Sequence, residues 1–131
     1  MKFELFDMYL DGDNNPASGF TTYLWPAGAG ADFLLEGPAG SPSWGSVYAH
    51  TGVGNGFSFN PTFGFDAAMM FGPLKTVAGK NYMEMSIKKT AIGSPTGAIN
   101  FGMIELDGSW NALGKLPESE TPTSKFVRVP L

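Results

Sequence analysis

The stretch DGDNNPASGF, which starts at Asp11, brings together side chains that bind hard cations. Asp11, Asp13 and Asn15 stand at positions one, three and five, the spacing at which calcium loops present side-chain oxygens to the ion. Position six of such a loop needs glycine and position twelve a bidentate glutamate, but this chain has Pro16 and Thr22 there. The stretch therefore matches only the first half of a calcium loop, and an EF-hand is excluded.

A tight turn is the other explanation of the same residues. Asp and Asn side chains accept hydrogen bonds from backbone amides in turns, Pro16 fixes φ, and Gly19 can adopt a positive φ. Such turns are far commoner than ion sites, so we expect a structural turn. A calcium ion held by Asp11, Asp13 and Asn15 is the alternative, and no other cofactor is expected.

Aromatic side chains form the second set of candidates. Sugar binding uses flat rings against the apolar face of a pyranose, with a few polar groups for its hydroxyls. Trp25 lies in the Pro- and Gly-rich loop TTYLWPAGAG and Trp44 at the start of a strand, so we expect both rings to be presented to solvent. Trp110, which follows a turn, is expected to cap the core. The candidate ligand-binding residues are Tyr23, Trp25, Trp44 and Tyr48.

The sequence offers no recognisable catalytic group. It has no cysteine, and His50 is its single histidine, with no G-x-S-x-G motif to supply a serine nucleophile. A glycosidase needs two carboxyl groups roughly 5 to 9 Å apart across a sugar, and spacing along the chain does not show whether any two converge. We therefore expect a protein that is not an enzyme, and we assign no catalytic residues.

Composition restricts the partners. The 131 residues, 43% of them hydrophobic, suffice for one packed core, so we expect a single domain over residues 1–131, either complete or excised from a larger exported protein. The net charge is −4 and the 8 Lys and Arg are spread along the chain without a basic stripe, which argues against nucleic acid as a partner. No stretch approaches the roughly eighteen apolar residues of a membrane span.

Strand periodicity runs through most of the chain. Short apolar or alternating segments are bounded by Gly, Pro, Asn or Ser. The predicted strands are 2–10, 31–37, 44–51, 56–65, 67–72, 81–89, 98–106 and 125–131. About eight strands without long helices between them predict an antiparallel β-sandwich of jelly-roll, galactose-binding-like or immunoglobulin-like type.

Three local expectations accompany the strands. In the strand 81–89, Met83, Met85 and Ile87 alternate with polar residues, so their face should point inward. The segment 88–93 could form one helical turn closed by its final glycine, and SWNALGKLP could form another.

Four segments, taken in order, resemble a known group of modules. They are YLDGDNNPASGF, GADFLLEG, YMEMSIKKTAIGSP and INFGMIELDGSWN, which cover roughly residues 7–111. The pattern looks like the β-sandwich modules of exported Bacteroidota glycan-utilisation proteins, similar to the SusE/SusF-type surface starch-binding lipoproteins and more distantly to family-nine carbohydrate-binding modules. The resemblance implies a secreted or cell-surface sandwich that binds a polysaccharide or oligosaccharide, with the turn and strand motifs as framework.

Two functions follow from these observations. We expect non-catalytic glycan binding by an exported or cell-surface β-sandwich module. The alternative is a structural or adhesive module that binds protein within a secreted or virion assembly.

Overall fold

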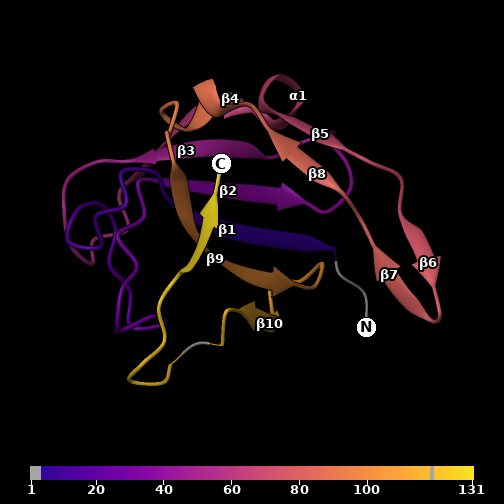
Figure 1. Cartoon of the computed structure of the whole chain (residues 1–131). Helices are drawn as coiled ribbons and strands as arrows, with labels where there is room; N and C mark the ends of the chain where they lie inside the picture. Colours follow the sequence, from indigo (N-terminus) through magenta and orange to yellow (C-terminus); the bar gives the residue numbers. More distant parts are fainter. Residues whose placement is uncertain (1–3, 119) are drawn as a thin grey trace.

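The computed structural model describes residues 4–118 and 120–131, and Figure 1 shows that its regular secondary structure is almost entirely β-strand. The pairing is antiparallel, which confirms the predicted all-β class and is consistent with a β-sandwich. The described residues contain eleven strands, more than the eight or so predicted. They are β1 (Leu5–Asp11), β2 (Phe33–Pro38), β3 (Ser46–His50), β4 (Phe59–Gly64), β5 (Met69–Phe71), β6 (Lys75–Val77), β7 (Lys80–Tyr82), β8 (Met85–Ile87), β9 (Ala98–Leu106), β10 (Ala112–Leu116) and β11 (Val127–Pro130), with the short helices α1 (Phe65–Ala68) and η1 (Lys89–Ile92).

Seven strands form the main sheet. They lie in the order β10-β9-β1-β2-β3-β4, and β11 pairs with the first part of β9. In this register Asp7 of β1 lies opposite Glu36 of β2 on one side and Ile104 of β9 on the other. The ribbons β5–β8 and β6–β7 are separate two-stranded sheets.

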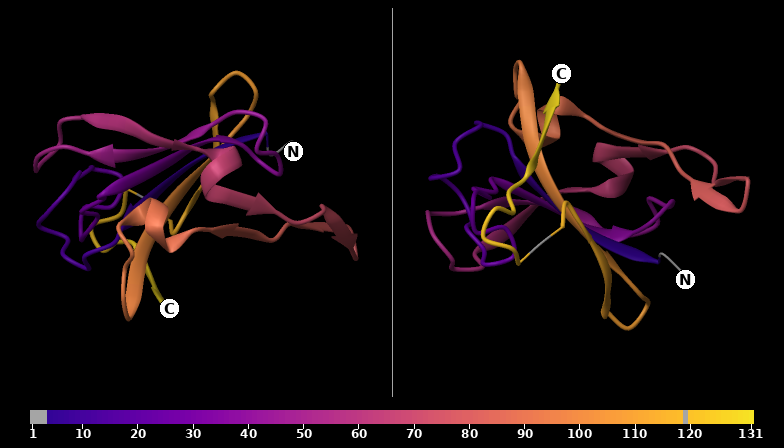
Figure 2. Two further views of the ribbon diagram at one scale, coloured as in Figure 1. Left: turned by 90° about the horizontal axis from the view of Figure 1, so that it is seen from above. Right: turned by 60° about the horizontal axis from the view of Figure 1, so that its bottom comes forward.

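One face of the main sheet carries the first hydrophobic cluster. Side chains alternate along β1, so Phe6 and Leu10 point to this face and Tyr9 to the other. Figure 2 shows α1 and the β5–β8 ribbon lying over one side of the sheet. The cluster consists of Phe6, Leu10, Leu35, Val47, Phe65, Ala68, Met69, Ala91 and Ile92.

The opposite face is covered along part of its length. The loop between β1 and β2 and the segment before β11 contribute most of a second cluster on this face, which packs Tyr9, Phe20, Leu24, Trp25, Ala29, Ala31, Leu34 and Phe126. We call this region the closed end. None of the residues of this cluster comes from the loops that join β2 to β3 or β9 to β10.

Several sequence predictions are confirmed at the level of single elements. The strand 98–106 has the predicted bounds, and η1 ends at Gly93, whose φ is 76°. Met83, Met85 and Ile87 are half-buried while their polar neighbours are exposed, as alternation predicted. None of the helices in the described part of the chain is long and apolar enough to cross a membrane.

Other predictions are wrong. SWNALGKLP contains the whole of β10 and no helical turn, because Ala112 to Leu116 pair with β9. The expected strand 81–89 is divided into β7 and β8, and β6 was missed. The expected strand 67–72 begins inside α1. The predicted start of the first strand at Lys2 lies outside the described residues.

Candidate functional site

Two half-exposed tryptophans from different loops meet at one end of the main sheet. Trp44, between β2 and β3, is 48% exposed, and Trp110, between β9 and β10, is 49% exposed. Their ring centroids lie 6.1 Å apart with the planes inclined at 58°. With Asp7 and Glu36, described below, they define what we call the tryptophan end.

Trp110 is held outward by a well-formed turn. The carboxylate of Asp107 accepts hydrogen bonds from the backbone N–H groups of Ser109 at 2.8 Å and Asn111 at 2.9 Å, and from the Asn111 side chain. The Asn111 side chain and these amides hold the pKa of Asp107 below its ordinary value. Trp110 itself adopts φ 65°, an unusual backbone conformation for a bulky residue. The expectation that Trp110 caps the core is therefore wrong.

Trp44 is directed away from the core by its neighbour. A Cβ atom on Gly45 would lie 2.7 Å from ring atoms of Phe65, so the backbone approaches the first cluster too closely for any side chain. The Phe65 N–H also donates to the Gly45 carbonyl at 3.1 Å. Because Gly45 faces this cluster, the adjacent Trp44 side chain points to the other side, where it contacts Trp110.

A pair of carboxyl groups lies on the main sheet, near the end where the tryptophans meet. Asp7 and Glu36 are directly opposite each other on β1 and β2. Burial, followed by the charge of Glu36 and a hydrogen bond with it, raises the pKa of Asp7 to about 7. Oδ1 of Asp7 is buried and receives no hydrogen bond from any donor of the described residues. Burial next to a second carboxyl group favours the protonated form of Asp7.

The carboxyl pair lies near the same end of the main sheet as the segments that carry the tryptophans. Along β1 and β2, one row of side chains on this face, that of Leu5 and Pro38, separates the pair from the end of the sheet. Two residues of a strand span about 7 Å. The tryptophan end therefore combines two half-exposed rings with a pair of carboxyl groups near the same end of the main sheet.

The closed end contains a tryptophan that is fully buried. Trp25 is 1% exposed, and its ring packs against Tyr9 and Phe126 at centroid distances of 6.0 and 5.1 Å. Its Nε1–H donates to the Pro117 carbonyl at 3.1 Å. The expectation that Trp25 is presented to solvent is therefore wrong: the loop around it folds over the sheet and buries the ring.

The remaining predicted aromatics do not join the tryptophan pair. Tyr23 is 77% exposed on the loop of the closed end. Tyr48 is half-buried and packs against the second cluster. Of the four predicted ligand-binding residues, Trp44 alone has a ring contact with Trp110 among the contacts of the described residues. The structure thus separates the predicted set into a buried core residue, two residues near the closed end and one residue of the tryptophan end.

The Asp-rich turn holds its own backbone. Asp13 accepts a hydrogen bond from the Asn15 N–H at 2.8 Å and from the Ser18 hydroxyl at 2.9 Å. Asp11 is buried and accepts from the Asn15 N–H at 3.2 Å and from the Asn100 side chain at 2.9 Å. Burial raises the pKa of Asp11, although the Asn100 and Asn15 hydrogen bonds oppose it.

A third carboxylate joins this turn from the start of the next strand. Ligand atoms of Asp11, Asp13 and Asp32 lie within 4.8 Å of one another. Asp32 accepts hydrogen bonds from the N–H groups of Gly12 at 2.9 Å and Asp13 at 3.2 Å, and burial raises its pKa. Asn15 turns its side chain to the Ala17 N–H instead, at 3.1 Å. Each carboxylate accepts hydrogen bonds, as a structural turn requires.

Sequence reasoning missed three residues of the tryptophan end, Asp7, Glu36 and Trp110, and two of them had a signal in the sequence. Asp7 interrupts the apolar face of a predicted central strand, and an acidic residue at such a position is a signal for a perturbed carboxyl group. Trp110 follows DGS, a turn sequence that presents the next side chain to solvent. Both signals are local, whereas the convergence of four segments at this end is visible only in the folded chain.

Comparison with known proteins adds no relative. No family model matches the chain. No curated protein and no solved structure gave a significant match to it either. The resemblance to exported glycan-utilisation modules therefore stays a prediction.

Proposed function

We propose that this protein is a non-catalytic carbohydrate-binding module that takes a glycan at the tryptophan end, as part of a secreted or cell-surface protein. The single observation that carries the proposal is the contact between Trp44 and Trp110, two half-exposed rings supplied by separate loops. Soluble proteins rarely expose two adjacent large rings without use, and the C–H face of a pyranose is a fitting partner for them.

The geometry also suggests how a sugar would lie. With centroids 6.1 Å apart and planes inclined at 58°, the rings touch and leave no slot for a pyranose between them. A sugar would stack on the outer face of one ring and extend toward Glu36, whose oxygens can accept hydroxyl hydrogen bonds. Such a shallow, solvent-open surface supports weak binding of a chain end or a short oligosaccharide.

The carboxyl pair supports binding over hydrolysis. Retaining glycosidases place their two carboxyl groups about 5 to 5.5 Å apart and inverting ones about 6.5 to 9.5 Å apart, to leave room for the sugar or a water. Asp7 and Glu36 lie directly opposite each other on adjacent strands, and Oδ1 of Asp7 is buried rather than open to a sugar, so we expect no release of reducing ends from polysaccharides.

Affinity electrophoresis in gels containing α-glucan, β-glucan, mannan or xylan tests the proposal. We expect retardation by at least one polysaccharide, and about tenfold weaker binding in Trp44→Ala and Trp110→Ala, because each loses one stacking surface. Tyr23→Ala is the matched control, since it removes an exposed aromatic residue at the closed end and should bind normally. Failure of every polysaccharide to retard the protein at millimolar binding-site concentration would refute the proposal.

Protein binding within an assembly is the second candidate function. A different part of the molecule, the β6–β7 hairpin, favours it, and that hairpin does not share a residue with the tryptophan end. The two functions can therefore be tested separately.

A further inference from the structure

The β6–β7 hairpin projects from the body of the molecule as an arm, by which we mean residues 72–83. Figure 1 shows it reaching past the end of the main sheet, and both views of Figure 2 show it standing clear of the other strands. Among the described strands, β6 and β7 pair only with each other, and all of their residues are exposed. The arm therefore has both faces in solvent.

The arm is a regular hairpin with a defined turn. Val77 lies opposite Lys80, so two residues make the turn, Ala78 with φ 49° and Gly79 with φ 73°. Positive φ at both positions is the type I′ geometry that fits the twist of paired strands. A two-stranded hairpin without packing is marginally stable in water, so a partner surface would stabilise this one.

One face of the arm combines positive charge with apolar area. Lys75 lies opposite Tyr82, and Val77 lies opposite Lys80, so alternation places all four side chains on one face. Val77 is 59% exposed and Tyr82 is 55% exposed. A face of this composition fits a surface that supplies carboxylates around a patch of apolar atoms.

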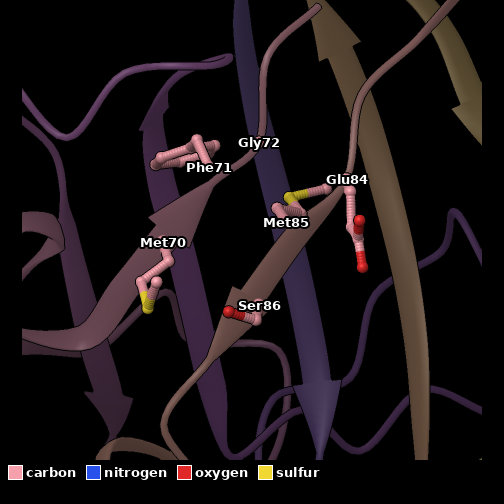
Figure 3. Close-up of a pocket in the computed structure, with 6 residues that line it drawn as sticks. All are labelled: Met70, Phe71, Gly72, Glu84, Met85 and Ser86. Carbon is pink, nitrogen blue, oxygen red and sulfur yellow. The ribbon is translucent and has the colours of Figure 1, made fainter.

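An apolar hollow lies at the base of the arm. It has a volume of about 230 Å³, and Figure 3 shows the residues that line it: Met70, Phe71, Gly72, Glu84, Met85 and Ser86. Met70 is 72% exposed beside the hollow, and Leu74 is 67% exposed where the chain enters the arm. Methionine side chains are flexible and suit surfaces that adapt to a partner.

The complementary charge lies on the rest of the same chain. Lys75 and Lys80 give the arm a net charge of +2 with no acidic residue, while the whole chain has −4, which leaves −6 on the remainder, including Glu84 just beyond the arm. We infer that the arm docks onto the acidic body of a second copy of this chain. The lysines then lie against carboxylates of the second copy, while Val77 and Tyr82 bury apolar area.

Sedimentation velocity over a range of protein concentrations tests the inference. We expect reversible self-association that weakens as salt is raised, because the contact pairs opposite charges. The double variant Lys75→Glu, Lys80→Glu should associate at least about tenfold more weakly. Lys88→Glu, Lys89→Glu is the matched control: it makes the same change in net charge at exposed residues outside the arm and should associate as the natural chain does.

Zero-length cross-linking identifies the contact itself. A carbodiimide joins lysine amines to carboxylates that touch them, and a mixture of light and isotopically heavy chains shows which links join two copies. We expect mixed-isotope links from Lys75 or Lys80 to Asp or Glu of the body. A monomer at several hundred micromolar in low salt, equal weakening in both double variants, or association whose mixed links never include the arm would each overturn the inference. Unchanged melting temperatures of the variants would show that any loss of self-association does not come from a loss of folding.

Discussion

The closed end and the tryptophan end lie on the same main sheet, yet their tryptophans are packed in opposite ways. Trp25 is 1% exposed beneath the loop between β1 and β2, whereas Trp44 and Trp110 are about half exposed on short connections. Residue type does not decide between these outcomes. What decides is the length of the covering segment, because a long loop can fold back over the sheet and a tight turn such as Asp107 to Asn111 cannot.

The different packing of the two ends should give them different roles in stability and in binding. Burial of a large ring contributes to the free energy of unfolding, while a half-exposed ring contributes much less and is available to a ligand. The closed end should therefore control stability, and the tryptophan end should control glycan binding.

The largest expected effect is that of Trp25→Ala. This change removes a fully buried ring and the hydrogen bond to Pro117, and we expect a loss of about 3 to 5 kcal/mol in the free energy of unfolding. Trp44→Ala and Trp110→Ala should each cost less than about 1 kcal/mol, since their rings keep much of their contact with water. Urea unfolding followed by circular dichroism measures all three. Equal losses at the two ends would remove the distinction between them.

A smaller effect is expected at Gly102, which lies under the closed end. A Cβ atom there would lie 2.7 Å from the ring of Phe126 and 2.9 Å from that of Trp25, in a packed cluster. We expect Gly102→Ala to cost about 1 to 3 kcal/mol through overpacking. Gly56→Ala, on an exposed loop where a Cβ atom meets nothing within 4 Å, is the control and should be nearly neutral. A neutral Gly102→Ala would show that this cluster is looser than its contacts indicate.

Sequence patterns were sufficient for the fold class and for most strands of the main sheet. Alternation identified the inward face of Met85 and Ile87, and a glycine marked the end of η1. Patterns failed for β6, a three-residue strand whose residues are all exposed, because strand prediction relies on a buried face that the arm does not have. They also failed for β10, where pairing with β9 overrode the local preference of NALGKL.

The candidate site was less predictable than the fold, for a physical reason. Exposure of a ring depends on which distant segment covers it, so the loop composition that favoured presentation of Trp25 gave the wrong result. The Asp7 and Glu36 pair depends on the register of β1 against β2, which no short-range pattern contains. The Asp-rich turn was easier, because hydrogen bonds such as that from the Asn15 N–H to Asp13 join neighbours in the sequence.

The tryptophan end should also make stability depend on pH. The pKa of Asp7 is raised to about 7 in the folded protein from an ordinary value of 3.8, so the folded state binds this proton more tightly than the unfolded state. The contribution of Asp7 to the free energy of unfolding is therefore complete below about pH 3.8. It is lost as pH rises through about 7, by up to about 1 kcal/mol per pH unit. Burial raises the pKa of Asp11 and Asp32 in the same direction.

Asp7→Asn separates the contribution of this pair from the others. The amide can donate to Glu36 without titrating, so the variant should lose most of the pH dependence between about pH 5 and 8 and be more stable than the natural chain at pH 8. Asp32→Asn at the closed end is the comparison, and it should leave that dependence largely in place. Thermal melts at four pH values measure these effects. A pH profile that Asp7→Asn does not change would show that the proton is not held by this pair.

The smallest expected effect is that of calcium on the Asp-rich turn beside the closed end. A cation would need Asp11, Asp13 and Asp32 to exchange their present donors, such as the Ser18 hydroxyl and the Asn100 amide, for the ion. An ion that binds only the folded protein must raise the melting temperature by mass action, so affinity and stability cannot be separated. We expect millimolar calcium or a chelator to change the melting temperature by less than about one degree, and Asp13→Ala to cost about 1 kcal/mol through its lost turn hydrogen bonds. Magnesium at the same concentration controls for ionic strength. A rise of several degrees with calcium alone, absent in Asp13→Ala, would instead make this turn a calcium site and would add a ligand to the end of the molecule that the packing otherwise closes.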